Sequence, residues 1–315
     1  MALDPQARAL LDLVARLGRP TYDQLPVAEG RRLYRETREA MQPAAPDLAV
    51  VKDLTAAGPA GPILLRLYRP DPVATLPALI YFHGGGWVIG DLDTHDVLCR
   101  QLAEQAGVAV VAVDYRLAPE HPFPAAVDDA WAATRWIASH ATELGLDAGR
   151  LAVGGDSAGG TLSAVVTLLA RDHGGPALRF QLLIYPATDM KRGTASHAAF
   201  ADGYLLTASL IQWFSAQYLR GAGDVRDWRA SPLAAASLAG VPPALVMTAG
   251  FDPLCDEGEA YARRLREAGV TADSVCYGGM IHGFLPMGRM LDTANRAVSH
   301  AAASLRQALA AGGPP

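Results

Sequence analysis

The chain has 315 residues and a formal net charge of −5 at pH 7, and half of its residues are hydrophobic. This composition supplies enough apolar side chains for a large buried core. Lysines and arginines are scattered along the chain, which argues against a nucleic-acid-binding protein or one that binds an anionic membrane surface. The three cysteines, Cys99, Cys255 and Cys276, form no Cys-x-x-Cys pair, a pattern typical of free thiols in a reducing compartment.

The sequence offers no targeting or membrane-spanning segment. Residues 1–5 lack a positively charged segment followed by an apolar stretch, so we predict no signal peptide. The uncharged run over residues 157–170 is shorter than the roughly 18 apolar residues that a spanning helix needs. We therefore expect a soluble, cytoplasmic protein with no membrane span.

Helical and strand patterns alternate along most of the chain. Strands over 49–54 and 63–68 flank a turn rich in Gly and Pro and precede any crossover helix, so we expect them to be antiparallel. Further strands are predicted over 78–82, 108–113, 151–153, 180–185, 244–249 and 272–277, and helices near 10–17 and over about 27–41, 94–106, 125–140, 161–170, 256–268 and 293–310. This order predicts an α/β fold with a mostly parallel, eight-stranded sheet that is covered by helices on both faces.

One segment, about residues 189–227, breaks this alternation. It contains an aromatic-rich helix over 209–219, with Phe214 near its centre. Because long structured connections in compact domains are usually functional, we predict that this segment and residues 1–45 form a helical cap on a single catalytic domain that spans 1–315. An ordinary surface excursion, whose aromatic side chains simply pack onto the core, is the alternative.

The motif Gly155-Asp156-Ser157-Ala158-Gly159 lies between a predicted strand and a predicted helix. A nucleophilic serine on a strained strand-to-helix turn needs a glycine on each side, and the first N–H groups of the helix point at the reacting centre. Ser157 is therefore the predicted nucleophile. A serine that merely caps the helix is the alternative for this motif alone.

A second motif, His83-Gly84-Gly85-Gly86-Trp87, follows the third predicted strand. Three consecutive glycines leave backbone N–H groups unhindered, and a serine hydrolase needs such donors for its oxyanion. We predict that the N–H groups of Gly84, Gly85 and Ala158 form the oxyanion hole, and that His83 fixes the loop. No Gly-Lys-Ser/Thr or Gly-x-Gly-x-x-Gly pattern is present, which argues against a phosphate-binding loop.

The acid and the base of a triad follow the serine in the order Ser, acid, His. Asp252 lies just past a predicted strand, whereas Asp256 and Glu257 fall in the first helical turn, where carboxylates complement the helix dipole. Only His282 and His300 come after Asp252, and His300 lies within the last predicted helix. We therefore predict Asp252 as the acid and His282 as the base.

Together these motifs resemble the hormone-sensitive-lipase-like family of α/β-hydrolase carboxylesterases, in its bacterial family IV subgroup with a Gly-Asp-Ser-Ala-Gly elbow. The resemblance implies an eight-stranded α/β-hydrolase core with a helical cap, no cofactor or metal, and a small acyl ester of short-to-medium chain length as the substrate. Cys255 departs from the family pattern, which often has Arg there. The matching segments extend in the same order over nearly the whole chain: His83–Trp87, Asp114–Glu120, Gly155–Gly159, Asp252–Leu254, Asp256–Gly258 and His282–Phe284.

These residues predict two-step acyl transfer. His282 removes the proton of Ser157, Asp252 orients the imidazole, and water then hydrolyses the acyl-enzyme. Their positions beside the glycine loop and in the insertion suggest that three apolar residues line the acyl or alcohol pocket: Trp87, Leu205 and Phe214.

Three other functions are compatible with parts of this sequence. A ligand-binding module is one, because plant gibberellin receptors resemble this family, but they have lost the histidine that corresponds to His282. An interfacial lipase is expected to have an exposed lid and a secretion signal. An amidase or deacetylase with the same triad stays open, and the edge strand over 272–277 offers a surface for a homodimer.

Overall fold

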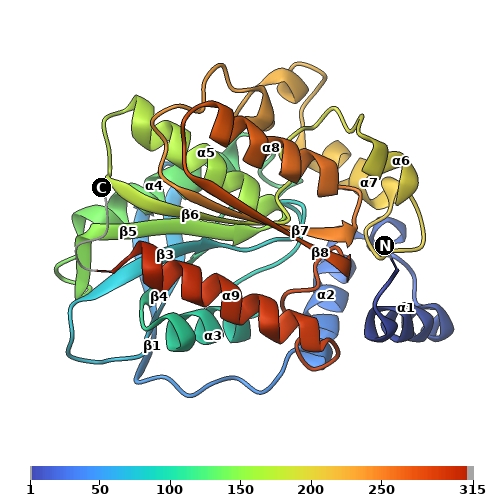
Figure 1. The fold of residues 1–315 in the computed structure, drawn as a ribbon, viewed down its shortest axis with the longest axis horizontal. Helices are drawn as coiled ribbons and strands as arrows, with labels where there is room; N and C mark the ends of the chain where they lie inside the picture. Colours follow the sequence, from blue (N-terminus) through green and yellow to red (C-terminus); the bar gives the residue numbers. More distant parts are fainter. Residues whose placement is uncertain (1, 311–315) are drawn as a thin grey trace.

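The computed structural model describes residues 2–310, in which eight strands form one sheet in the order β1-β2-β4-β3-β5-β6-β7-β8 (Figure 1). β1 and β2 are antiparallel to each other, β2 is antiparallel to β4, and the other neighbours are parallel. The predicted sheet is therefore confirmed. Its strands are β1 (Val50–Gly58), β2 (Gly61–Arg69), β3 (Leu76–Phe82), β4 (Ala109–Asp114), β5 (Leu146–Asp156), β6 (Leu178–Ile184), β7 (Ala244–Phe251) and β8 (Ala272–Ile281).

Most predicted helices occur within three residues of their expected ends. Asp4 accepts the N–H groups of Gln6 and Ala7 and so caps the first helix. The helices are α1 (Pro5–Leu17), α2 (Val27–Met41), α3 (Asp96–Ala106), α4 (Ala125–Ser139), α5 (Ala158–Asp172), α6 (Ala195–Ala199), α7 (Ala208–Tyr218), α8 (Cys255–Glu267) and α9 (Asp292–Ala308), with short 3-10 turns η1 (Tyr22–Gln24), η2 (Asp224–Arg226) and η3 (Pro232–Ala234).

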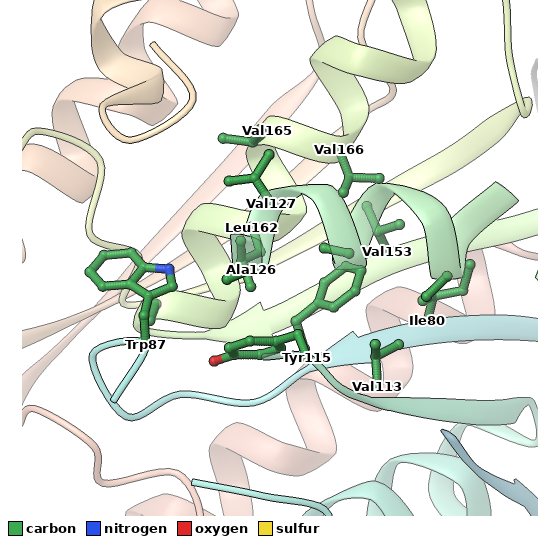
Figure 2. Close-up of a cluster of buried hydrophobic side chains, with 14 of the residues drawn as sticks. Ile80, Trp87, Val113, Tyr115, Ala126, Val127, Val153, Leu162, Val165 and Val166 are labelled. Atoms are coloured by element: carbon green, nitrogen blue, oxygen red, sulfur yellow. The ribbon is translucent and has the colours of Figure 1, made fainter. Parts of the chain in front are cut away.

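The central strand β3 is buried on both faces. Leu79 and Tyr81 pack with α3 and α9, whereas Ile80 and Phe82 pack with α4 and α5 on the opposite face. Figure 2 shows part of this second cluster around Ile80. Because side chains alternate across a strand, helices on both faces require the continuous apolar run that β3 has.

β5 is longer than the three-residue strand that the sequence predicts. It begins at Leu146 and runs to Asp156, with a register shift against β3 between Leu76 and Ala78. Its first half contains the polar residues Asp147 and Arg150, so the sequence there shows no continuous apolar run that would predict a buried strand.

The insertion after β6 and the N-terminal helices lie at one end of the sheet. Figure 1 shows α1, α2, α6 and α7 at the end where the arrows of β7 and β8 finish. α7 contacts η1, and Tyr22 of η1 packs edge-on against Tyr34 of α2 with ring centroids 5.9 Å apart. Among the described helices, none is long and apolar enough to cross a membrane.

Candidate active site

Ser157 occupies a sharp turn between β5 and α5. Its backbone has φ 54° and ψ −118°, a conformation that is strained for a residue with a side chain. Gly159, on the other side of the turn, packs against the carbonyl of Phe82, and any side chain there would collide with this oxygen. The small residues around Ser157 thus allow the strained turn that places the serine at the end of β5.

The structure brings Ser157, Asp252 and His282 together from three segments. His282 Nε2 lies 2.9 Å from Ser157 Oγ, and His282 Nδ1 lies 2.7 Å from Asp252 Oδ2. Asp252 is fully buried, and the side chain of His282 is 11% exposed. The arrangement can pass a proton from the serine hydroxyl to the imidazole while the carboxylate holds the ring.

The loop after β7 fixes the carboxylate of Asp252. Its Oδ1 accepts the N–H of Leu254 at 2.8 Å, so one oxygen is used by the backbone and the other faces His282. Tyr185, after β6, packs against the imidazole with ring centroids 4.8 Å apart. His300 is exposed on α9, and its Nδ1 lies 3.1 Å from the hydroxyl of Tyr277 instead.

The glycine loop after β3 differs from the prediction at one position. The Gly84 N–H donates to the Asp156 carboxylate at 2.9 Å, so it is already used within the protein and the predicted oxyanion role of Gly84 is wrong. Gly85 and Gly86 follow with φ values of 119° and 60°, in the region that favours glycine. Within residues 2–310, no protein oxygen accepts from their N–H groups.

The segment Asp114–Glu120 braces this loop at both ends. The Tyr115 hydroxyl donates to the His83 carbonyl at 2.7 Å, and the Ala118 N–H donates to the Trp87 carbonyl at 2.8 Å. The rings of His83 and Tyr115 also stack with centroids 4.3 Å apart. These contacts support the prediction that His83 holds the loop, and they explain why this segment accompanies the glycine motif.

Asp156 forms a buried polar centre that sequence reasoning missed. Its Oδ1 accepts from the Tyr81 hydroxyl at 2.7 Å and lies 3.2 Å from His95 Nε2. Burial opposes its ionisation, but His95 and Tyr81 together keep the pKa of Asp156 well below its usual value. Burial and the neighbouring His95 also lower the pKa of His83 to about 4, so that ring is neutral at pH 7.

The first turn of α8 holds the insertion in place. Ser196 of α6 donates its hydroxyl to the Pro253 carbonyl at 2.6 Å, and its N–H to the Asp256 carboxylate at 2.8 Å. The buried Glu257 accepts the N–H of Thr188 at 2.6 Å. Asp256 and Glu257 thus do more than complement the helix dipole, because they join α6 and Thr188 to the first turn of α8.

The N-terminal helix α2 contacts the loop that carries His282. Arg38 is buried on α2 and donates to the Gly283 carbonyl at 3.2 Å, next to His282. Its guanidinium also lies over the Tyr34 ring, 4.7 Å from the centroid. A single arginine in a charged helix gives no signal of such a distant contact in the sequence.

The three predicted pocket residues differ in their surroundings. Phe214 of α7 lies against Gly86, where any side chain would collide with its ring. Trp87 is 2% exposed and stacks on Tyr218 with ring centroids 4.3 Å apart, so its main contact is with α7. Leu205 is partly buried and packs with the α3–α9 side of the core.

Metal-ligating side chains gather elsewhere in the part of the chain that the structure describes. Three donor atoms of Cys255, Glu259 and Cys276 lie within 4.8 Å of one another. This cluster contains none of Ser157, Asp252 and His282. The arrangement at Ser157 is instead a hydroxyl, an imidazole and a carboxylate in one hydrogen-bonded series.

Comparison with known proteins identifies the family of this chain. Residues 79–286 match the family described as the alpha/beta hydrolase fold. Over 241 residues the chain is 54% identical to carboxylic ester hydrolase LipN of Mycobacterium tuberculosis, a match that covers 75% of this chain and 64% of LipN. Esterase LipI of the same organism is 44% identical, over 98% of this chain and 96% of its own.

A solved structure has nearly the same fold. An ester hydrolase from the metagenome of Lake Arreo, complexed with a derivative of bipyridine phosphonate, superposes with a TM-score of 0.94 at 50% identity, covering 96% of this chain and 98% of that one. The family match extends over more than half of the chain. The chain belongs to the α/β-hydrolase family, in its hormone-sensitive-lipase-like carboxylesterase branch.

Proposed function

We propose that this protein is a serine carboxylesterase that hydrolyses short-to-medium-chain acyl esters. One observation carries the proposal: a continuous hydrogen-bonded series from Asp252 through His282 to Ser157, with distances of 2.7 and 2.9 Å. The esterase names of its relatives support the same reaction class.

His282 takes the proton from Ser157 as the oxygen attacks the ester carbonyl, and Asp252 stabilises the imidazolium that forms. The imidazolium then protonates the leaving alcohol. Water attacks the acyl-enzyme by the same route, with His282 again as the base. Burial of Asp252 favours this role, because a water-excluded carboxylate interacts more strongly with the imidazolium than a solvated one.

The oxyanion is stabilised by the N–H groups of Gly85, Gly86 and Ala158. Ala158 is the first residue of α5, so its N–H has no partner inside the helix and lies at the positive end of the helix dipole. Gly86 replaces Gly84 in this set, because the Gly84 N–H is bound to Asp156. Losing one such donor typically costs about 3 kcal/mol of transition-state stabilisation.

Residues 1–45 and 189–227 form the cap of a single catalytic domain. Two anchors support this role: Ser196 ties the insertion to Pro253 beside the acid, and Arg38 ties α2 to Gly283 beside the base. Phe214 and Leu205 serve as walls of the acyl pocket, and Trp87 contributes an edge while it supports Phe214's helix.

The test compares p-nitrophenyl acetate, butyrate, octanoate and palmitate as substrates. We expect rapid turnover of the short esters, little of palmitate, and a loss of about a thousandfold or more in Ser157→Ala. Ser139→Ala, at an exposed position of α4, is the matched control and keeps full activity. Circular dichroism checks that each variant is folded.

The same assay separates the alternative functions. No turnover of any ester by folded wild type would favour a ligand-binding module. Faster cleavage of the corresponding p-nitroanilides than of the esters would favour an amidase. A rate that jumps when palmitate forms an emulsion would favour an interfacial lipase.

A further inference from the structure

Two of the three cysteines meet beside the first turn of α8. Cys255 begins this helix, Glu259 follows one turn later on the same face, and Cys276 lies on the neighbouring edge strand β8. Their Sγ and carboxylate oxygen atoms all lie within 4.8 Å of one another, and Cys255 Sγ is 3.9 Å from Glu259 Oε1. Residues far apart in the sequence thus place three ligand atoms around one point.

The surroundings leave these atoms available. Cys255 is 9% exposed, Cys276 is partly exposed, and Glu259 is exposed. Among the ion pairs of residues 2–310, none includes Glu259. A buried, inert thiol looks different: Cys99 is fully buried within α3, with no second cysteine beside it. The cluster therefore has one buried ligand, Cys255, and a side that is open to solvent at Glu259 and Cys276.

Two thiolates and one carboxylate are donors that Zn²⁺ prefers, with bond lengths of about 2.3 Å to sulfur and about 2.0–2.2 Å to oxygen. Tetrahedral coordination at these lengths places neighbouring ligand atoms roughly 3.5–3.8 Å apart. The observed sulfur–oxygen distance of 3.9 Å is within a few tenths of an ångström of that value. Hard cations such as Mg²⁺ and Ca²⁺ need oxygen donors and do not fit this set.

We propose that Cys255, Glu259 and Cys276 bind one thiophilic divalent cation, Zn²⁺ being the best match, with the fourth position open to water. The ion joins the first turn of α8 to β8. Each thiol gives up its proton to solvent when it binds. Because the site contains none of Ser157, Asp252 and His282, the proposed metal binding does not depend on whether the protein is an esterase.

The experiment titrates the reduced, metal-free, full-length protein with Cd²⁺ and follows the ultraviolet charge-transfer band of cadmium–thiolate bonds. Competition with a chromophoric chelator then gives the affinity for Zn²⁺. We expect saturation at one ion per chain. Cys255→Ser and Cys276→Ser each weaken binding by about tenfold or more, and Glu259→Gln weakens it by about tenfold.

Two matched controls keep the cluster intact. Cys99→Ser removes the buried thiol of α3, and Glu267→Gln changes an exposed carboxylate in the last turn of α8. Both variants bind like the wild type. As a second readout, a fixed, near-stoichiometric concentration of Zn²⁺ raises the melting temperature of the wild type and of both controls by more than that of either cysteine variant.

Several results would overturn the proposal. They are a folded wild type that does not saturate at one ion per chain, unchanged affinity in both cysteine variants, or a Cys255–Cys276 disulfide that persists under reducing conditions. If one cysteine variant fails to fold, the other cysteine variant and Glu259→Gln still decide the outcome.

Discussion

The carboxylate of Asp156 accepts the N–H of Gly84 at 2.9 Å, and so connects the residue before Ser157 to the glycine loop. The same carboxylate oxygen accepts from Tyr81 and lies beside His95. One buried anion therefore sets the position of Gly85 and Gly86 relative to Ser157.

Replacing this anion is expected to disturb the loop without removing the triad. Asp156→Asn keeps the size of the side chain but loses the charge, and we expect kcat to fall on the order of tenfold to a hundredfold with little change in KM. The free energy of unfolding falls by roughly 3 kcal/mol, because His95 and Tyr81 lose a buried charged partner. Asp147→Asn, on the same strand, is the control; equal effects in both variants would contradict the account.

The pKa of Asp156 also predicts a pH dependence. Because its folded-state pKa lies below the usual value of 3.8, the carboxylate stabilises the fold above that pH, and this contribution is lost as the pH falls through the folded-state pKa. Chemical denaturation between neutral and acidic pH measures the difference between wild type and Asp156→Asn. That difference should shrink on acidification; a constant difference would be inconsistent with a buried anion.

Much of this fold follows from local signals in the sequence. α2 begins at Val27, after Pro26, and ends at Met41, before Pro43, as the spacing predicts. The order of Asp252 and His282 along the chain also predicts that they lie close together, because each follows a strand that ends at the same edge of the sheet, and their side chains are 2.7 Å apart.

The features that the sequence does not predict depend on contacts between residues that are far apart in the chain. Gly84 and Asp156 are 72 positions apart in the chain. The sequence alone therefore does not reveal that the Gly84 N–H, predicted as an oxyanion donor, is bound to the Asp156 carboxylate. The same applies to Ser196 and Pro253, which are 57 positions apart. Hydrogen bonds of this kind have no periodicity to detect, and only the folded chain brings their partners together.

The contact between α6 and the loop of Asp252 gives a further prediction. Ser196→Ala removes the hydroxyl that donates to Pro253, leaving that buried carbonyl without this donor. We expect a loss of about 1–2 kcal/mol in the free energy of unfolding and a several-fold lower kcat on butyrate. Ser209→Ala, exposed on α7, is the control. If the two variants were equally active and equally stable, α6 would not be anchored through this hydroxyl.

For Glu257, the predicted dependence of stability on pH has the opposite sign to that of Asp156. Burial, opposed by the charge of Arg192, raises its pKa from 4.5 to about 7. Between these values the folded protein holds a proton that the unfolded chain releases, so stability relative to Glu257→Gln falls as the pH rises, by up to about 1.4 kcal/mol per pH unit. Burial lowers the pKa of His197, and its Nε2 lies 3.3 Å from Glu257 Oε2, so the difference between the two proteins includes any change in the ionisation of His197.

Denaturant titrations of wild type and Glu257→Gln at about pH 5 and about pH 8 measure this effect. Glu104→Gln, at an exposed position of α3, serves as the control, and its difference from wild type should not follow the same trend. A wild type that gains stability relative to Glu257→Gln at the higher pH would show that the ionised carboxylate is favoured in the folded protein.

The contact between Phe214 and Gly86 predicts how the pocket limits chain length. Phe214→Ala removes the ring beside the glycine loop, and we expect the octanoate-to-butyrate ratio of kcat/KM to rise by about tenfold. Gln212→Ala, exposed on the same helix, should leave the ratio unchanged. An unchanged ratio in Phe214→Ala would remove this residue from the pocket.

The central claim is that Ser157 carries the acyl group. A carbamate ester transfers a carbamoyl group that leaves serine slowly, so the covalent intermediate accumulates and mass spectrometry of the proteolysed protein can locate it. We expect one carbamoyl group per chain, on Ser157, at a rate that matches the loss of esterase activity, and none in folded Ser157→Ala. A carbamoyl group on another residue, or activity lost without any label on Ser157, would contradict this claim.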